Sequence, residues 1–485
     1  MKNNQIRSIK YNFVMNLILT ASNFLFPLIT FPYVSRVLQV EANGILAYVT
    51  SIVSYFSLVA SLGIPTYGIR AAATVRDDKR KLSKVVQELL IINIVLVGFV
   101  LIIYFIMLFT FPSMLVYREL FYINAIGIVL NVLGVNWFFQ AIEQYDYITV
   151  RSIIFRIFSI VLMFIFVHQP SDYIIYGLIL VFSSAGSNIL NFKRLFKYIT
   201  LKKQDKYEFV PHFKPILILF AQSLVISIYT NLDLIMLGSI KDSYEVGLYT
   251  AATKLKLILL SIVNSLGNVL LPRMSYYAKR NMKEQFERIT AQAINFTLFI
   301  SFPLAVFFTL NAKESLFLLA GEQYLGAVLS MQFLTIAVIP IGITGILGIQ
   351  VLTPLEKEKY LLISVIVGAV IDLLLNFILI SSYGSSGAAF ATMIAEFAVL
   401  FVQIYYTRGL LFKIAHQIVG IRYLFTVSIS VLGMILVKSL QLSYFWLLCV
   451  EGIIFFGSYA VILVLLKDDF IINFLENFYK KLKKF

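Results

Sequence analysis

Residues 86–111 read VQELLIINIVLVGFVLIIYFIMLFTF, with no charged residue after Glu88. About 20 consecutive apolar residues allow a helix to span the hydrocarbon core of a bilayer, so this stretch predicts a membrane-spanning helix. Segments of the same kind follow one another along the chain and predict about 14 such helices. Their ranges are 11–35, 43–65, 86–111, 120–141, 148–168, 173–192, 214–240, 246–271, 290–311, 326–351, 360–381, 386–406, 420–438 and 442–466.

The composition supports this interpretation. Of the 485 residues, 60% are hydrophobic and 13% charged, whereas a soluble domain is about 45–50% apolar and about 25% charged. About 14 spans take up about 280 residues, which leaves no room for a large soluble domain. The sequence therefore predicts an all-α polytopic membrane protein. Its single cysteine, Cys449, excludes disulfides within the chain and multi-cysteine metal centres.

The common sequence signatures of catalysis are missing. The chain contains no G-x-x-x-x-G-K-[ST], H-E-x-x-H, C-x-x-C or G-x-S-x-G motif. The predicted outer loops are short, the longest being about 312–325, whereas a membrane-bound glycosyl polymerase is expected to display a larger one. We therefore expect a protein that is not an enzyme and that needs neither a cofactor nor a metal.

The net charge of +15 is concentrated in alternate connections. With the N-terminus inside, seven of the 40 Lys and Arg fall outside the inner segments: Arg36, Arg118, Lys241, Lys254, Lys256, Lys313 and Lys438. Cytoplasmic loops carry such an excess of basic residues, so both termini are predicted to be cytoplasmic. Topology and anionic membrane lipids explain the charge, and no nucleic-acid partner is needed.

A faint internal repeat divides the chain at its basic loop, 193–213. Gly44 precedes the Ser-Leu-Gly of 61–63 much as Gly247 precedes the Ser-Leu-Gly of 265–267, with an offset of about 203 residues. Several secondary transporters are built from parallel repeats related by an axis along the membrane normal. The repeat therefore predicts two halves of the same topology.

Ionisable residues inside the apolar segments cost about 2.5–3.5 kcal/mol each at a helix centre and usually face a cavity. Lys254 and Lys256 lie about 12–15 Å into the segment 246–271. The alternative for both lysines is that they snorkel to the interface. Asp233 either forms a structural ion pair with one of them, or it binds a proton or cation or orients the lysines.

Other residues of the apolar segments allow similar alternatives. Arg36, at the outer end of the first segment, either anchors it at the interface or places a cation at the mouth of a cavity. Asp372 and Glu396 are candidates for binding a coupling ion. Pro27 and Pro32 each remove a helical hydrogen bond, which predicts kinks in the first segment.

Two stretches carry a family signature. Residues 137–143, WFFQAIE, match W-F-F-Q-G-x-E except at Ala141, where glycine is commoner. Residues 231–254 match N-x-D…M-L-G…V-G-x-Y…A…K, from Asn231 to Lys254. Both resemble polysaccharide flippases of the Wzx type, in the oligosaccharide/polysaccharide transporter branch of the multidrug/oligosaccharidyl-lipid/polysaccharide exporter (MOP) superfamily.

This resemblance implies a fold of two pseudo-symmetric six-helix lobes that works by alternating access. The lobes correspond to residues 1–200 (helices 1–6) and 201–412 (helices 7–12). Residues 413–485 then hold two accessory helices, 13 and 14, and a basic cytoplasmic tail.

The resemblance further implies the substrate. An oligosaccharide repeat unit on undecaprenyl pyrophosphate is expected to be flipped to the outer leaflet of the bacterial cytoplasmic membrane, for a capsule or an O-antigen-like polysaccharide. Membrane lipids, a polysaccharide polymerase and chain-length machinery are the expected partners. The residues expected to bind this substrate are the cations Lys254, Lys256 and Arg36, the carboxylate Asp233, and the polar residues Asn231, Gln140 and Asn136.

The driving force and two other functions stay open at this point. Transport is expected to be coupled to the membrane potential, to H⁺ or to Na⁺, with Asp233, Asp372 and Glu396 as candidate ion ligands. A drug/cation antiporter of the same superfamily would favour an acidic and aromatic cavity, whereas the central pair here is lysine. A membrane polymerase or ligase acting on lipid-linked sugars is the other alternative.

Overall fold

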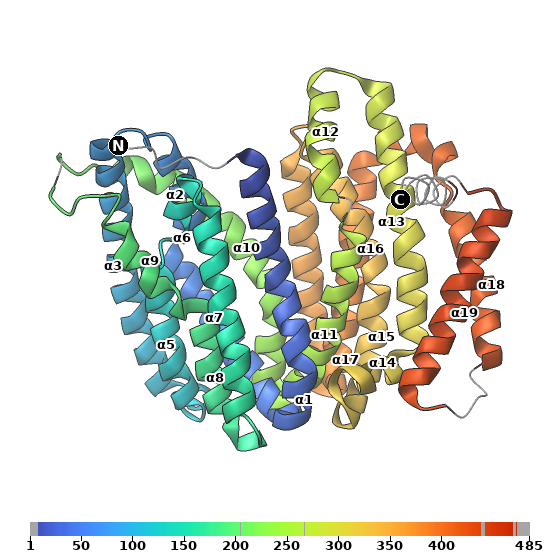
Figure 1. Ribbon diagram of the computed structural model, residues 1–485. Coiled ribbons are helices and arrows are strands. Elements are labelled where there is room, and N and C mark those ends of the chain that lie inside the picture. The colour runs from blue at the N-terminus through green and yellow to red at the C-terminus, as the bar shows by residue number, and fades with distance from the viewer. Residues whose placement is uncertain (1–7, 204, 266, 438–441, 469–471, 473–485) are drawn as a thin grey trace, which may run out of the picture. The chain divides into compact units, whose positions relative to one another are not determined.

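A computed structural model describes residues 8–203, 205–265, 267–437, 442–468 and 472. Over these ranges the chain forms helices and no strands, as Figure 1 shows. The prediction of an all-α fold is therefore confirmed. The predicted cytoplasmic residues 1–7 and 473–485 lie outside the described ranges.

Contacts within the chain define two compact units, 1–247 and 248–485. The first unit holds α1 (Ile9–Ser61), α2 (Ile64–Ala73), α3 (Lys79–Thr110), α4 (Pro112–Leu115), α5 (Arg118–Leu133), α6 (Asn136–Ala141), α7 (Tyr145–Phe166), η1 (Pro170–Asp172), α8 (Tyr173–Val181), η2 (Phe182–Gly186), α9 (Asn188–Leu195), α10 (Val210–Ile240) and the start of α11 (Ser243–Val263). The second unit holds the rest of α11, then α12 (Gly267–Lys279), α13 (Lys283–Leu310), α14 (Ala312–Ala320), η3 (Glu322–Ala327), α15 (Val328–Ile336), α16 (Val338–Thr344), η4 (Gly345–Leu352), α17 (Glu358–Ile414), η5 (Ala415–Gln417), α18 (Gly420–Val437) and α19 (Tyr444–Leu465). The lobe boundaries predicted at 200 and 412 stay predictions.

Eleven helical segments of the described chain are long and apolar enough to cross a membrane, so a multi-pass membrane protein is confirmed. Two of them, Tyr11–Ala73 and Glu358–Gln417, have 63 and 60 residues, far more than the roughly 20 that one span needs. Each contains an interior residue with non-helical torsions, Gln39 or Gly384. The predicted count of about 14 spans stays a prediction.

The break in α1 differs in position from the predicted kinks. The non-helical torsions fall at Gln39 (φ 65°, ψ −175°), beyond Pro27 and Pro32, which stay inside helical backbone. A positive φ is uncommon for a residue with a side chain, so the two halves of α1 are separated sharply there. The kinks predicted at the two prolines stay a prediction, and the break at Gln39 is an additional feature that the sequence does not predict.

The predicted helix 120–141 is also interrupted. α5 ends at Leu133 and α6 begins at Asn136, because Val135 adopts a left-handed conformation (φ 37°). A β-branched residue rarely takes this conformation, so the surrounding packing must enforce it. The family signature 137–143 begins directly after this break.

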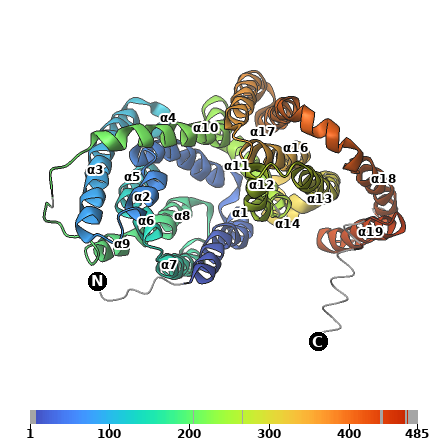
Figure 2. The same ribbon diagram turned by 90° about the horizontal axis from the view of Figure 1, so that it is seen from above.

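Helices of the first unit enclose two apolar clusters. One is built around α1, α3 and α5, with Leu38, Tyr104 and Phe121 at its centre. The other surrounds α6, with Phe138 and Phe139 fully buried. α1, α7 and α8 pack against one another, as the end-on view in Figure 2 lets the reader follow. This group of three helices forms the cavity described below.

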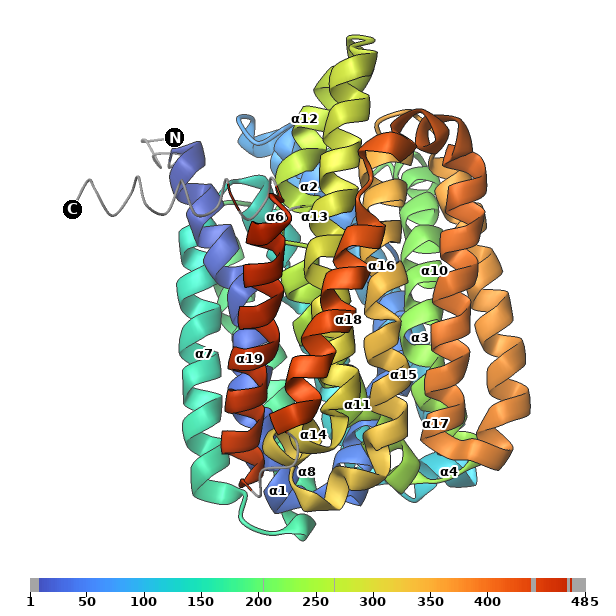
Figure 3. The same cartoon turned by 90° about the vertical axis from the view of Figure 1, so that its right-hand side faces the viewer.

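In the second unit, α13 packs against α15, α16 and α18, and α18 packs along α19. α17 turns back on itself at Gly384 (φ 53°), and its two arms run side by side in Figure 3. Glycine adopts a positive φ without steric cost, which suits it to this turn. The arms correspond to the segments 360–381 and 386–406 that the sequence predicts as separate helices.

Candidate functional site

The signature WFFQAIE forms a buried corner of the first unit. The Trp137 ring covers Gly68 on α2 so closely that a Cβ at that glycine would lie 2.6 Å from ring atoms. Phe138 and Phe139 stack edge to face, with ring centroids 5.3 Å apart. Ala141 is buried as well. The aromatic part of the signature therefore fixes how α6 packs on α2.

The last residue of the signature, Glu143, connects three segments. Its carboxylate accepts a hydrogen bond from Arg76 Nη1 at 2.6 Å and one from Asn12 Nδ2 at 3.3 Å. Arg76 lies in the turn between α2 and α3, and this hydrogen bond raises the pKa of its guanidinium above the ordinary value. Glu143 thus joins the start of α1 to that turn and to the residues before α7.

Asn136, predicted to line a polar cavity wall, lies at the centre of a buried hydrogen-bond network. Its Oδ1 accepts from Arg151 Nη2 at 3.0 Å and from Asn191 Nδ2 at 2.8 Å. Its Nδ2 donates to Asn188 Oδ1 at 3.3 Å. The amide group is therefore engaged within the protein. Gln140, one turn further along α6, is partly buried.

Asn231 and Asp233 lie on α10, which packs along α1. Asn231 Nδ2 donates to Ser227 O at 3.2 Å, and Tyr55 on α1 donates its hydroxyl hydrogen to the same carbonyl oxygen, also at 3.2 Å. Asp233 is buried, with 5% of its surface exposed. A Cβ at Gly238, the glycine of the M-L-G part, would lie 2.1 Å from the Tyr48 ring on α1. The N-x-D…M-L-G stretch is thus an α1–α10 contact surface.

Gly44 and Gly247, the glycines of the internal repeat, meet at a reciprocal backbone contact. A Cβ at Gly44 would lie 1.6 Å from Ser243 O, and a Cβ at Gly247 would lie 2.1 Å from Val40 O. Each glycine therefore faces the carbonyl oxygen of the residue four positions before the other glycine. Such reciprocity is expected where two equivalent segments cross, and it supports the repeat seen in the sequence.

Arg36 lies near the end of the first half of α1. Its side chain is exposed, and its Nη1 donates to Pro32 O at 2.6 Å. This carbonyl belongs to the helical turn just before Arg36. The cation therefore sits next to the break at Gln39.

Lys254 and Lys256 are both partly buried within α11. Being two residues apart, they point about 200° away from each other around the helix. In the described part of their own unit, no hydrogen bond or ion pair holds either ammonium group. The roles predicted for the two lysines stay predictions.

Asp372 and Glu396 lie on the two arms of α17, equally far along the chain from the turn at Gly384. Both are buried. Tyr249 on α11 and Thr392 on α17 share a buried hydrogen bond of 3.0 Å between their hydroxyl groups. Lys254 lies five residues after Tyr249, and Glu396 lies four residues after Thr392. These two predicted site residues therefore occur on helices that are in contact.

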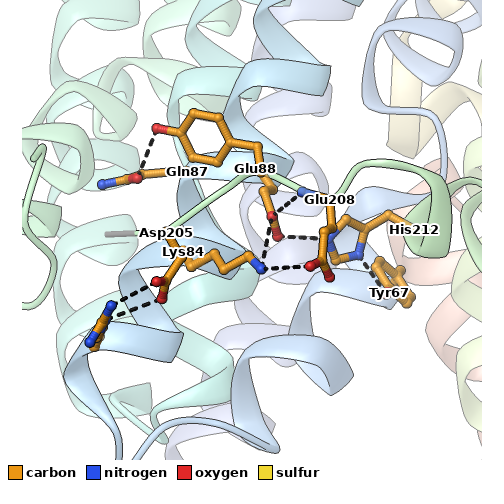
Figure 4. A network of polar contacts seen from close by, with 9 residues as sticks. Tyr67, Lys84, Gln87, Glu88, Asp205, Glu208 and His212 are labelled. Atoms are coloured by element: carbon orange, nitrogen blue, oxygen red, sulfur yellow. Dashed lines mark hydrogen bonds and ion pairs between the residues drawn. The ribbon is translucent and has the colours of Figure 1, made fainter. Parts of the chain in front are cut away.

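Sequence reasoning missed a buried polar cluster at the start of α3, drawn in Figure 4. Glu88, 2% exposed, contacts His212 Nε2 at 3.0 Å, and Tyr67 contacts His212 Nδ1 at 2.7 Å. Lys84 lies 3.9 Å from Glu88 and 3.5 Å from Glu208. These contacts hold the basic loop before α10 against α3. The signal available in the sequence was a glutamate at the head of the apolar run 86–111.

Arg151 and Arg156 lie in α7 (Tyr145–Phe166), which is apolar enough to span a membrane and agrees with the predicted helix 148–168. The predicted orientation counts both arginines with the inner side. Arg156 lies about 16 Å along that helix. The orientation of the chain in the membrane is inferred mainly from the other basic residues, and it stays a prediction.

The described chain is thus a polytopic helical membrane protein with charged residues inside its apolar helices. The lipid II flippase MurJ in an inward closed conformation superposes with a TM-score of 0.72 at 16% identity, over 95% of this chain and 100% of that one. An inward-facing multidrug resistance MATE family transporter superposes with a TM-score of 0.59 at 15% identity, over 84% and 98%. These similarities concern the fold.

The chain belongs to the family described as "Polysaccharide biosynthesis protein", whose family model matches residues 9–278; the MatE model matches residues 219–378. A Shigella dysenteriae protein named "Putative O-antigen transporter" is 26% identical over 400 residues, 80% of this chain and 97% of that protein. The Staphylococcus aureus "Capsular polysaccharide biosynthesis protein CapF" is 24% identical over 413 residues, 83% and 98%. The predicted resemblance is confirmed.

Proposed function

We propose that this protein flips a lipid-linked oligosaccharide, carried on undecaprenyl pyrophosphate, from the inner to the outer leaflet for surface polysaccharide assembly. The observation that carries the proposal is membership of the polysaccharide biosynthesis family over residues 9–278. The names of the relatives, an O-antigen transporter and a capsular polysaccharide protein, support the same pathway class. Alternating access is the mechanism that its transporter fold supports.

The charges of α11 fit such a substrate. A pyrophosphate brought into a low-dielectric site needs fixed cations, and Lys254 and Lys256 supply two. Sugar hydroxyl groups need polar side chains, for which Asn231 and Gln140 are the proposed partners. A drug/cation antiporter would need the opposite polarity.

The membrane potential is the proposed driving force. Moving one charge through 100 mV releases about 2.3 kcal/mol, so two negative charges moving outward in a cell that is negative inside gain about 4.6 kcal/mol. If the lysines move back through the membrane field without substrate, the positive charge that they carry reduces this net gain. Asp233 is proposed to hold the lysine site, and Asp372 and Glu396 are the candidates if an ion is coupled.

A deletion strain tests the proposal. Loss of the protein should leave unpolymerised lipid-linked units in the inner leaflet, whereas loss of a polymerase would leave them in the outer leaflet. Lys254→Ala should insert in the membrane but fail to restore export, and Lys254→Arg should restore more because the charge is kept. Lys279→Ala, at an exposed lysine of the same unit, is the matched control and should restore export fully. Outer-leaflet accumulation in the deletion strain would overturn the proposal.

A further inference from the structure

A cavity of about 200 Å³ lies between α1, α7 and α8 of the first unit. One water molecule needs about 10–15 Å³ of such space, so the cavity can hold a much larger group. Asn23 and Pro27 on α1 and Ser184 on η2 line it and are exposed. The cavity is therefore accessible from outside the helix bundle.

Arg156 is the charged residue in this cavity wall. Its two terminal nitrogens donate to Ser22 Oγ and Asn23 Oδ1, and its guanidinium carbon lies 5.8 Å from the centroid of the Phe26 ring. No ion pair neutralises Arg156 anywhere in the described ranges. A charge at this depth costs about 2.5 kcal/mol or more, so an arginine without a carboxylate partner points to an anion that is not part of the chain.

The lining changes from a polar end around Arg156 to a more apolar end, which also holds Tyr176 and Thr30. Along α7 it changes from Arg156 and Ser159 to Ile160 and Met163, and Met163 lies about two turns after Arg156. α8 follows α7 after a short connection and therefore runs back beside it. Its lining changes in the matching direction, since Ser183 follows Ile179 by one turn. A ligand that fits this wall carries its charge beside an alkyl chain.

The backbone around Ser183 is also unusual. η2 (Phe182–Gly186) is a π-helical segment inserted between α8 and α9. Such segments are rare and occur frequently at functional sites. Here the segment presents Ser183 and Ser184 to the cavity. This observation is independent of the charge of Arg156 and marks the same place.

We propose that this cavity binds the phosphate group of a lipid, with Arg156 as the anion-binding residue and Asn23 and Ser22 as positioning residues. Guanidinium groups suit phosphate because their planar fork donates two hydrogen bonds in parallel. The phosphate belongs either to a polyprenyl diphosphate or to a membrane phospholipid, and both present the same group beside hydrocarbon. The site is built on α7 from residues other than the lysines of α11, and it does not depend on the proposed transport activity.

Binding to the purified full-length protein tests this assignment. Farnesyl diphosphate in detergent and phosphatidylglycerol in nanodiscs are the two probes, and farnesol is the uncharged control. Each is measured with the wild type and with Lys254→Gln, in which the proposed site on α11 is weakened. In both backgrounds Arg156→Gln should weaken binding by about tenfold or more, the worth of a charge-assisted contact. Arg118→Gln, at an exposed arginine of the same unit, should leave binding unchanged.

The outcomes separate the two sources. Loss confined to farnesyl diphosphate identifies a polyprenyl diphosphate site, and loss of phosphatidylglycerol binding identifies a phospholipid site. Arg156→Lys should lose less binding affinity than Arg156→Gln. If Arg156→Gln does not fold, the comparison is made with Arg156→Lys instead. Binding of both probes that is the same in the Arg156 variants as in Arg118→Gln would overturn the assignment. A protein that binds through Arg156 but does not flip lipids would overturn only the proposed function.

Discussion

The reciprocal contact of Gly44 and Gly247 yields a quantitative prediction. In Gly44→Ala the new Cβ would lie 1.6 Å from Ser243 O, whereas Cβ atoms essentially never approach closer than 3.0 Å. The two backbones must therefore separate by about 1.4 Å. Both sides of the contact are main chain, so no change of rotamer can relieve it.

The expected destabilisation is about 3 kcal/mol, the upper end of the range for overpacked cores. For a unit of this size, about 3 kcal/mol lowers the melting temperature by about 6–12 °C. Gly247→Ala should behave similarly, since its Cβ would meet Val40 O at 2.1 Å. Gly98→Ala is the matched control: its Cβ meets nothing within 4 Å, and alanine improves helix propensity by up to about 1 kcal/mol.

The assay is the folded fraction remaining after heating, measured by size-exclusion chromatography of the detergent-solubilised protein. The predicted order of melting temperature is Gly98→Ala at or above the wild type, and Gly44→Ala and Gly247→Ala well below it. A Gly44→Ala protein that melts within two or three degrees of the wild type would refute the close backbone approach.

Three further predictions concern the first unit. Trp137→Ala should destabilise the protein by about 3–5 kcal/mol, as for a buried tryptophan, and wild-type accumulation in the membrane would contradict the packing described. His212→Ala removes the His212 contact of the buried Glu88 and should cost about 1–3 kcal/mol in the same melting assay; an unchanged melting temperature would count against the cluster. With Cys449→Ser as background, Lys203→Cys should resist an impermeant maleimide added to intact cells, and efficient labelling would reverse the predicted orientation.

The sequence predicts the apolar helices well because each is a local property of composition. The interruptions were harder, since they depend on contacts. Gln39 and Val135 take positive φ values although neither residue type favours them. The prolines of α1, which do carry a local signal, stay within helical backbone. Tertiary packing decides where these helices break.

The candidate site shows the same limit. Motif similarity led to Lys254 and Asp233 because both lie in a signature stretch. Glu88 and His212 are separated by 124 residues, and no pattern in either segment reveals their contact. Arg156 falls within the predicted helix 148–168, but nothing in the sequence shows which neighbours its side chain meets. Only the folded chain places it in a cavity wall.

The central claim is that the protein moves a lipid-linked oligosaccharide across the bilayer, and transport by the purified protein in liposomes tests it most directly. The substrate is an undecaprenyl-pyrophosphate-linked oligosaccharide with a fluorescent sugar, and its arrival in the far leaflet is read by quenching. The account predicts transport by the wild type that accelerates under an imposed potential of the cellular sign at equal pH and sodium. It also predicts a rate lowered about tenfold or more in Lys254→Ala, with Lys279→Ala unchanged. Liposomes in which the wild type moves no more substrate than protein-free vesicles would contradict the account.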